Sequence, residues 1–386
     1  MTPEQLQNTA NFVKKMLGLR IIAKPLRVEE GPVVCTYYFE LDHSIPIAKI
    51  LSKAEDFALA AGVETLSITR MGGEIVFFVP NKVRKVIEFK DYLNWYLLDP
   101  KVSQMSIPIP LGVDHVGKFS AIDLVELPHL LLAGATGSGK SVYECAILCS
   151  ISTLRTGRDI RFVLVDTKQM DLPLFSSLPH INRIVTTLHD YFAMMDDLMA
   201  EYRTRQQRII AAGVRNIREY NTLVGPENAM PFIVLLIDEY GDLKLQDDAE
   251  RKGASDDRKA VPRVNEYMQR LVQVCRAVGI HVILGTQRTS VDIIDGSIKA
   301  NFQARVSLRL PTQIDSRTIL DSPGAETLLG KGDMLLLSPN SEKLQRYHGP
   351  FVNLEDIGRV LMDLDMIRMQ YERLRNAKND QKIEIL

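Results

Sequence analysis

Two short runs of residues have the types and spacing needed to bind and cleave a nucleoside triphosphate. Residues Gly134 to Ser141 read GATGSGKS, which fits the phosphate-binding loop pattern GxxxxGK[ST] completely. The loop follows an aliphatic stretch at 129–133 and opens a helix-like segment, which is the context that the motif requires. Its glycines let backbone N–H groups turn toward phosphates, and the following helix N-terminus adds partial positive charge.

The polar members of this loop have separate predicted tasks. Lys140 is expected to reach the β- and γ-phosphates, and the Ser141 hydroxyl is expected to ligate Mg²⁺. The predicted cofactors are therefore ATP and Mg²⁺. The other residues of the cofactor-binding set surround the phosphates, and they are Gly134, Thr136, Gly137, Ser138 and Gly139.

A second run, IVLLIDE, ends the aliphatic stretch 233–237 with two acids. Asp238 is expected to hold Mg²⁺ through water, and Glu239 to orient and deprotonate the attacking water. Two acids after a strand are common in general, but after a phosphate-binding loop the pair is specific. Because a glutamate here favours hydrolysis over transfer to another substrate, the sequence predicts an ATPase.

Hydrolysis also needs groups that sense the γ-phosphate and stabilise the transferred charge. The aliphatic stretch 281–285 ends in TQR, so Gln287 lies at the tip of a neighbouring strand and is the predicted sensor. On the preceding helix, Arg270 and Arg276 could reach a nucleotide held by the next subunit. The alternative is that both are ordinary solvated arginines.

The elements that must position these residues alternate between short strands and long helices from about residue 127 onward. This alternation predicts a mostly parallel sheet with helices on both faces. A C-terminal helix is expected over 354–374. The predicted strands are 129–133, 162–165, 232–237, 281–285 and 304–310, and the predicted helices are 140–154, 188–212 and 260–278.

The first hundred residues have a different pattern, typical of a small α+β module. Strands are predicted at 32–41, 64–69 and 74–79, with a helix at 47–61 and a hairpin turn at Gly72-Gly73. Pro108 and Pro110 then interrupt the pattern. The predicted domains are residues 1–110, residues 111–352 with the ATPase motifs, and a C-terminal helix with a charged tail at 353–386.

Composition is that of a soluble globular protein, and a cytoplasmic location is expected. The 386 residues are 46% hydrophobic with a formal net charge of −1, so no overall basic character points to nucleic acid. The four cysteines show no pairing or metal-binding pattern, which favours buried reduced thiols. No signal peptide is evident, and no apolar run approaches the ~20 residues of a membrane span.

Several further stretches of the sequence, taken in their order along the chain, match one known family. They are 127–141 (LPHLLLAGATGSGKS), 162–168 (FVLVDTK), 213–221 (GVRNIREYN), 276–281 (RAVGIH), 285–288 (GTQR), 298–301 (IKAN), 314–321 (IDSRTILD) and 330–335 (GKGDML). From about residue 30 to residue 352 the sequence therefore resembles the motor of the FtsK/SpoIIIE DNA translocases. The resemblance implies a small module followed by a RecA-like P-loop NTPase module, and a homohexameric ring around double-stranded DNA with ATP between subunits.

The resemblance also implies roles for particular residues. Arg276 matches the trans-acting arginine of the family. The DNA-contacting loops match Arg288, Lys299 and Arg317, which would hold phosphates in a sequence-independent, salt-sensitive way. Gln313 stands where many members have a lysine, so one phosphate contact is expected to be missing or replaced. Asp166 and Lys168 match a family motif to which the residues alone give no chemical role.

Three features depart from the family pattern. The chain shows neither the N-terminal membrane region and linker of the cell-division members nor the C-terminal winged-helix module that reads orienting sequences. The segment 220–231 is also short. Recruitment by an unidentified partner and polarity of movement are therefore expected to come from elsewhere.

Three functions are compatible with these motifs. The first is a DNA translocase without sequence specificity of its own, and the second is a secretion-type ATPase acting on protein. The third is an assembly protein that uses ATP only to hold a ring together. The cations Arg288, Lys299 and Arg317 favour DNA over polypeptide. Glu239 and Arg276 argue against the third function, because a purely structural nucleotide site needs neither residue.

Overall fold

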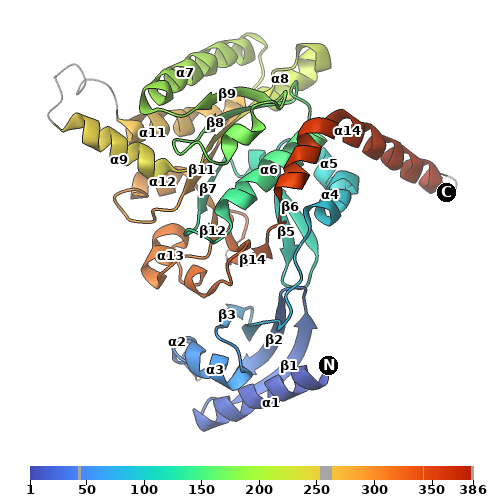
Figure 1. Cartoon of the computed structure of the whole chain (residues 1–386), viewed down its shortest axis with the longest axis vertical. Helices are drawn as coiled ribbons and strands as arrows, with labels where there is room; N and C mark the ends of the chain where they lie inside the picture. Colours follow the sequence, from blue (N-terminus) through green and yellow to red (C-terminus); the bar gives the residue numbers. More distant parts are fainter. Residues whose placement is uncertain (42–44, 253–262, 342, 384–386) are drawn as a thin grey trace.

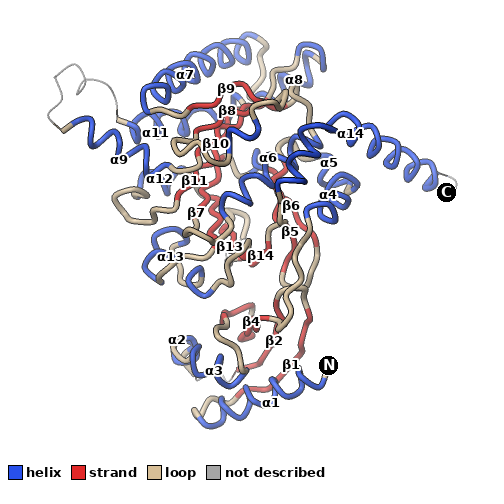
Figure 2. The backbone as a smooth tube through the Cα atoms, in the orientation of Figure 1, coloured by secondary structure: helices blue, strands red, loops and turns tan. Residues whose placement is uncertain are grey.

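The computed structural model describes residues 1–41, 45–252, 263–341 and 343–383. Within this part of the chain a small N-terminal unit lies below a larger one (Figure 1). In the larger unit the strands run through the centre and the helices lie outside them (Figure 2). The α/β fold with a mostly parallel sheet, preceded by a smaller module, is therefore confirmed.

The small unit is an antiparallel sheet of order β1-β2-β4-β3, covered by helices. Its core includes four phenylalanines with no exposed surface: Phe12, Phe39, Phe57 and Phe77. Neighbouring rings lie 4.8–6.2 Å apart between centroids. The elements are α1 (Pro3–Gly18), β1 (Ala23–Glu30), β2 (Val34–Leu41), α2 (Ile47–Leu51), α3 (Ala54–Ala61), β3 (Ser67–Met71) and β4 (Glu74–Pro80).

Three of these strands were predicted and one was not. The predictions at 32–41, 64–69 and 74–79 correspond to β2, β3 and β4. The predicted helix 47–61 is two helices, because the chain breaks at Ser52-Lys53. β1 was not predicted because its residues are mostly exposed or half-buried. Its pairing with β2 also shifts register after Pro25.

The larger unit contains a ten-stranded sheet of order β6-β5-β14-β13-β12-β7-β11-β10-β8-β9. The six strands from β12 to β9 are parallel, and the four at the other end pair antiparallel. The strands are β5 (Pro108–Asp114), β6 (Phe119–Asp123), β7 (His129–Ala133), β8 (Ile160–Val165), β9 (Ile181–Val185), β10 (Phe232–Ile237), β11 (Ile280–Thr286), β12 (Ala304–Leu308), β13 (Asp333–Leu337) and β14 (Gln345–His348).

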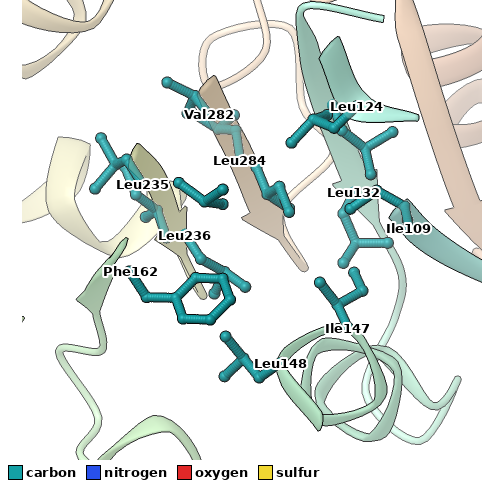
Figure 3. Packing of buried hydrophobic residues seen from close by; sticks show 14 of the residues in the cluster. Ile109, Leu124, Leu132, Ile147, Leu148, Phe162, Leu235, Leu236, Val282 and Leu284 are labelled. Atoms are coloured by element: carbon teal, nitrogen blue, oxygen red, sulfur yellow. The ribbon is translucent and has the colours of Figure 1, made fainter. Parts of the chain in front are cut away.

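One helix, α6, is buried over almost its whole length in the core of the larger unit. In Figure 3, Leu148 of this helix lies next to Phe162 of β8, and Ile147 lies nearer to Leu132 of β7 and Ile109 of β5. No helix among the described residues is long and apolar enough to cross a membrane. The helices are α4 (Phe89–Leu98), α5 (Pro100–Gln104), α6 (Lys140–Leu154), α7 (Leu188–Ala211), α8 (Ile217–Val224), α9 (Tyr240–Arg251), α11 (Val264–Val274), α12 (Gly296–Asn301), α13 (Gln313–Leu320) and α14 (Leu354–Ile383).

The predicted elements of this unit agree closely with the structure. The strands 129–133 and 232–237 and the helix 140–154 have the predicted bounds. For the predicted helix 260–278, residues 260–262 lie outside the described part; α11 then ends at Val274 and a 3₁₀ turn follows over Cys275–Val278. The strand predicted at 304–310 ends at Leu308.

The division predicted at residue 110 falls inside β5. Phe89 and Tyr92 of α4 already lie in the core of the larger unit. Lys85 still donates a backbone hydrogen bond to Pro32 of the small unit, at 3.0 Å. Packing therefore favours a boundary just after Lys85. The two prolines of β5 are tolerated because β14 pairs only with the far end of that strand, at Val113 and Asp114.

Arg346 of β14 connects the two units. Its guanidinium forms a buried ion pair with Asp333 at 2.6 Å and donates to Ser67 Oγ of β3 at 3.2 Å. It also lies 5.1 Å from the ring centre of Phe78 in β4. Because the Arg346 guanidinium has polar partners in both units, it links the small sheet to the large one.

His129 is a fully buried histidine at the start of β7 that is fixed in its neutral form. The backbone N–H of Val282 donates to its Nδ1 at 3.1 Å, so this nitrogen carries no proton. The other nitrogen, Nε2, lies 3.1 Å from the carbonyl oxygen of Val272 and donates to it. Burial, with the nearby His281, lowers the pKa of His129 to about 3.

We expect His129 to make the fold sensitive to mild acid. Below pH 6.5 the unfolded chain binds a proton at this residue, whereas the folded chain does not until about pH 3. Its contribution to stability is therefore lost as pH falls from 6.5, by roughly 1.4 kcal/mol per pH unit. Urea unfolding between pH 7 and 4.5 should show a shallower pH slope for His129→Gln than for the wild type. Equal slopes would contradict this assignment.

Candidate nucleotide-binding site

The phosphate-binding loop lies between the end of β7 and the start of α6, as predicted. Gly134 N–H donates to Thr286 O of β11 at 3.2 Å, and Ala135 N–H donates to Arg309 O, after β12, at 3.0 Å. The loop is therefore fixed between the two strands that flank β7. Gly137 and Gly139 have φ of +76° and +103°, values that favour glycine.

A second glycine-rich turn, at residues 330–332, packs against the phosphate-binding loop. The N–H of Gly332 donates to Ser138 O at 2.9 Å, and a Cβ on Gly139 would lie only 2.7 Å from that nitrogen. Gly330, Lys331 and Gly332 all have positive φ, between +51° and +96°. The sequence contains this turn in its GKGDML stretch, but nothing in the pattern predicted that it contacts the phosphate-binding loop.

Lys140 lies at the first turn of α6 and is almost completely buried. Its Nζ donates to Asp238 Oδ1 at 2.5 Å, to the Asp238 carbonyl at 2.7 Å and to Glu144 Oε1 at 3.0 Å. Burial lowers the pKa of Lys140, but Glu144 and Asp238 outweigh this effect and raise it above its usual value. The lysine therefore keeps its charge inside the protein, which an anionic ligand requires.

Glu144 is a member of this cluster that the sequence analysis missed. It has no exposed surface, and its Oε2 has no hydrogen-bond partner in the described part of the chain. Burial raises the pKa of Glu144 well above its usual value, although Lys140 acts in the opposite direction. One feature of the sequence could have identified Glu144. It is a carboxylate four residues after the lysine, within the apolar segment that forms α6.

Glu239 follows β10 and is held by residues of β11 and the next turn. Thr286 Oγ1 donates to its Oε1 at 2.8 Å, and Gln287 N–H donates to its Oε2 at 2.9 Å. The Gly241 N–H adds a contact to Oε1 at 3.2 Å, so Glu239 also caps α9. The carboxylate is nearly buried and oriented on both oxygens. A general base needs this kind of fixed position.

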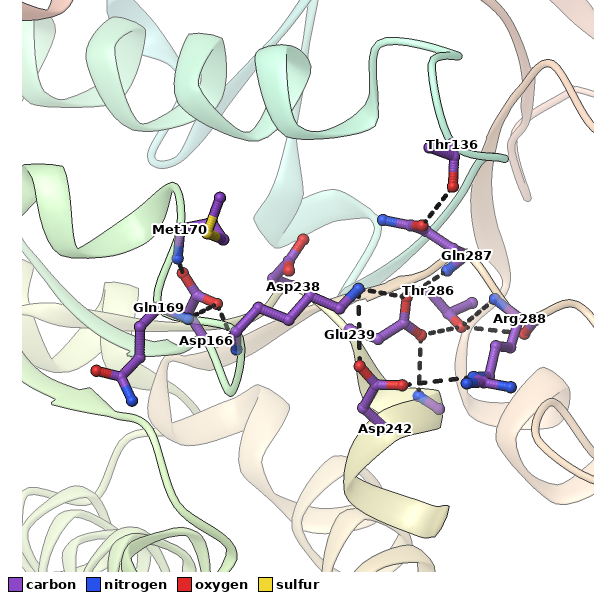
Figure 4. A network of polar contacts seen from close by, with 12 residues as sticks. Thr136, Asp166, Gln169, Met170, Asp238, Glu239, Asp242, Thr286, Gln287 and Arg288 are labelled. Carbon is purple, nitrogen blue, oxygen red and sulfur yellow. Dashed lines mark hydrogen bonds and ion pairs between the residues drawn. The ribbon is translucent and has the colours of Figure 1, made fainter. Parts of the chain in front are cut away.

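Gln287 connects Glu239 to the phosphate-binding loop. Its Oε1 accepts from Thr136 Oγ1 at 3.0 Å (Figure 4). The predicted sensor therefore touches the loop through its side chain and the predicted base through its backbone. Thr286, which orients Glu239, was not predicted to have a role, although it is the first residue of the quoted TQR run.

The donor set suits Mg²⁺ bound together with a nucleotide. Ser141 lies beside Lys140 at the start of α6, and Asp238 directly follows β10 and contacts that lysine. Burial raises the pKa of Asp238, but Lys140 outweighs this and lowers it below its usual value, so the carboxylate is ionised. Hydroxyl and carboxylate oxygens are Mg²⁺ ligands, and the ion takes the rest from phosphates and water. Within the described ranges no cluster of three His, Cys, Asp or Glu could hold an ion by itself.

Asp166 has a structural task that the sequence did not reveal. Its two oxygens accept from the backbone N–H groups of residues 168–172, at 2.9–3.2 Å. This buried carboxylate fixes the turn after β8. The turn places Lys168 Nζ 3.8 Å from Glu239 Oε2 and 3.6 Å from Asp242 Oδ2.

Arg276 lies far from the phosphate-binding loop of its own chain. It belongs to the 3₁₀ turn before β11, whereas Gln287 follows the other end of the same strand. Seven strand residues separate them by roughly 20 Å. Arg276 is exposed. An action of Arg276 on a nucleotide therefore requires a second copy of the chain.

The three cations predicted to contact DNA gather near α12 and α13, but they are not equally free. Arg317 is exposed. Arg288 is half-exposed and lies 3.4 Å from Asp242. Lys299 is mostly covered and forms an ion pair with Asp321. Gln313, at the first position of α13, is exposed beside them.

Comparison with known families matches both units of the chain. The model of the FtsK/SpoIIIE family matches residues 99–291, and that of the FtsK alpha domain matches residues 1–81. The DNA translocase FtsK of Shewanella oneidensis is 33% identical over 94% of this chain. The chain spans 42% of that relative's length, and less than half the length of other FtsK relatives.

Solved structures share the fold. The pCW3 conjugation coupling protein TcpA, in its monomer form with ATPγS, superposes with a TM-score of 0.61 and 22% identity, over 95% of this chain and 99% of that one. The cytoplasmic domain of the type VII secretion ATPase EccC of Thermomonospora curvata has a TM-score of 0.60 and 23% identity, over 74% of this chain and 34% of that one. The P-loop ATPase fold is thus common to all three chains.

Lys140→Ala is expected to abolish nucleotide binding and also to destabilise the fold. Without the ammonium, Asp238 remains as a buried carboxylate without its cation, a change that typically costs about 3–5 kcal/mol. Fluorescent-nucleotide titration and urea unfolding measure the two effects. Glu239→Gln is the matched control, which should bind nucleotide and fail to hydrolyse it. Wild-type hydrolysis by that control would remove Glu239 from the chemistry.

Proposed function

Because this chain belongs to the FtsK/SpoIIIE family, we propose that it is an ATP-driven motor that translocates double-stranded DNA. The observation that carries the proposal is the convergence of three features at one edge of the sheet. The phosphate-binding loop, the acids Asp238 and Glu239, and the turn that bears Arg288 all meet there. A nucleotide and a DNA phosphate would therefore be handled by adjacent residues.

The residues around the loop support ATP hydrolysis. Backbone N–H groups at the N-terminus of α6 and the ammonium of Lys140 bind the phosphates. Ser141 and Asp238 would hold Mg²⁺, which when bound neutralises phosphate charge. Glu239 orients the attacking water and accepts its proton, because Thr286 and Gln287 fix the direction of its carboxylate.

The position of Arg276 supports a ring of identical subunits. Since it cannot reach its own phosphate-binding loop, it would complete the site of a neighbouring subunit and stabilise charge on the transferred phosphoryl group. Each interface would then contain one ATP. A homohexamer around duplex DNA is the assembly that we propose.

DNA would be held by its phosphates without reading the bases. Arg288, Lys299 and Arg317 project from neighbouring segments, and long cationic side chains make phosphate contacts that are independent of sequence. Arg317 and Arg288 have the more accessible guanidinium groups. Lys299 would have to leave Asp321 before it could bind a phosphate.

A polypeptide substrate, as in a secretion-type ATPase, is the second candidate. Val291 and Ile314, beside the same cations, are 67% and 77% exposed. Exposed aliphatic residues in such loops suit contact with an unfolded chain better than contact with phosphates. The response to DNA separates the two candidates.

Linear duplex DNA is expected to stimulate steady-state ATP hydrolysis several-fold at low salt, and the stimulation is expected to fade as salt rises. Replacing Arg288, Lys299 and Arg317 together by alanine should remove the stimulation, while hydrolysis without DNA should be at least as fast as in the wild type. If stimulation survives this triple change, the DNA-contact assignment is wrong. Intact basal hydrolysis without any response of the wild type to duplex would favour a polypeptide substrate.

Mixing two inactive variants tests the shared site. Arg276→Ala lacks the arginine that a neighbour needs, and Glu239→Gln lacks the base, so each should be inactive alone. In randomly mixed rings, about one interface in four pairs an intact Glu239 with an intact Arg276. Activity should therefore return to a comparable fraction of the wild-type rate. Subunit exchange without recovery of activity would show that Arg276 does not act across the interface.

A further inference from the structure

Four charged side chains form a continuous line from the predicted base to the predicted DNA contact. Lys168 Nζ lies 3.8 Å from Glu239 Oε2 and 3.6 Å from Asp242 Oδ2. On the other oxygen of the same aspartate, Arg288 Nε lies 3.4 Å from Oδ1 (Figure 4). Asp242 therefore shares its negative charge between two cations, one facing the base and one facing solvent.

The backbone of Lys168 is fixed by the turn that carries it. The carboxylate of Asp166 accepts five backbone N–H groups of the turn that carries the lysine. Gln169, next in the chain, has a φ of +55°, unusual for a residue with a side chain. The turn after β8 is thus held in one conformation, which fixes the backbone of Lys168 and places its ammonium within reach of both Glu239 and Asp242.

Lys168 competes for the free side of the predicted base. Glu239 Oε1 already accepts from Thr286 and Gly241, while the one donor to Oε2 among the described residues is the Gln287 N–H. An attacking water must hydrogen-bond to the carboxylate, and Oε2 has the remaining acceptor capacity. The Lys168 ammonium lies 3.8 Å from Oε2 and attracts the lone pair that would accept a hydrogen bond from this water.

The other end of the line is accessible to an anion. The Arg288 side chain is 54% exposed, compared with 22% for Asp242. Its aliphatic part lies against the first turn of α9, where a Cβ on Gly241 would come within 2.8 Å of Arg288 Cδ. The glycine therefore lets this arginine reach Asp242 without closing it off from solvent.

We propose that Lys168 and Asp242 form a switch through which a DNA phosphate bound at Arg288 releases Glu239 for hydrolysis. When a phosphate takes Arg288, Asp242 keeps Lys168 as its only cationic neighbour in the line and draws the ammonium toward itself. The free side of Glu239 Oε2 then accepts the attacking water. This switch rests on the proposed function, because it takes duplex DNA as the ligand of Arg288.

Lys168 and Asp242 act as positioning residues, and their variants have opposite expected effects. Lys168→Met keeps the length of the side chain without the charge, so basal ATP hydrolysis should rise several-fold and DNA should add little. Asp242→Asn leaves Lys168 with Glu239 alone, so basal hydrolysis should fall and DNA should no longer stimulate it. The double variant should behave like Lys168→Met, because without the ammonium there is nothing for Asp242 to move.

The test compares steady-state ATP hydrolysis of the full chain with and without linear duplex, alongside the Kd for duplex. Lys101→Met, an exposed lysine on α5, is the matched control and should behave as the wild type. In Asp242→Asn the Kd for duplex should stay within about twofold of the wild-type value, since Arg288 remains. Loss of stimulation with retained binding is a result that simple loss of the DNA site would not give.

Two results would overturn the switch while leaving the proposed function intact. One is a Lys168→Met variant with wild-type basal and stimulated rates. The other is a Lys168→Met variant slowed in both conditions, as Glu239→Gln should be, because Lys168 would then assist the chemistry. If duplex DNA does not stimulate ATP hydrolysis by the wild-type chain, the proposed function itself is wrong. This measurement uses no variant, so its outcome is separate from the test of the switch.

Discussion

The buried ion pairs of Lys140 are the interactions on which the rest of the site depends. One ammonium holds together a helix that begins at the phosphate-binding loop and a strand that ends in the two acids. Asp238 could not stay charged at this depth without it, since an isolated buried carboxylate costs several kcal/mol. The lysine thus fixes the distance between the groups that bind phosphates and the groups that act on water.

The central part of the fold was predictable because its signals are local. β7, the loop and α6 follow one another directly, and an aliphatic run before a glycine-rich loop has few other solutions. The same holds for β10 with Asp238 and Glu239. The antiparallel strands β5, β6, β13 and β14 were missed because they are short, contain prolines or alternate weakly, and their pairing depends on contacts distant in the sequence.

The candidate site likewise has a part that the sequence predicted and a part that it did not. The residue types that bind phosphate could be read from a motif, whereas the orientation of Glu239 comes from Thr286, almost fifty residues later in the chain. Asp166 and Lys168 were recognised as a pair without a role. The partners of Lys168 are distant in the sequence, after β10 and in α9, and those of Asp166 are backbone groups of its own turn. The five backbone N–H groups that donate to the Asp166 carboxylate come together only in the folded turn, so the sequence does not reveal them.

The opposite placement of Arg276 and the phosphate-binding loop along β11 has a consequence for assembly. If the arginine of one copy serves the loop of the next, two different surfaces of the chain meet at every contact. Such a head-to-tail contact repeats from copy to copy, so it must either close after a fixed number of subunits or continue as a filament. The angle set at this one junction would therefore decide how many copies surround the axis, and hence the width of the opening between them.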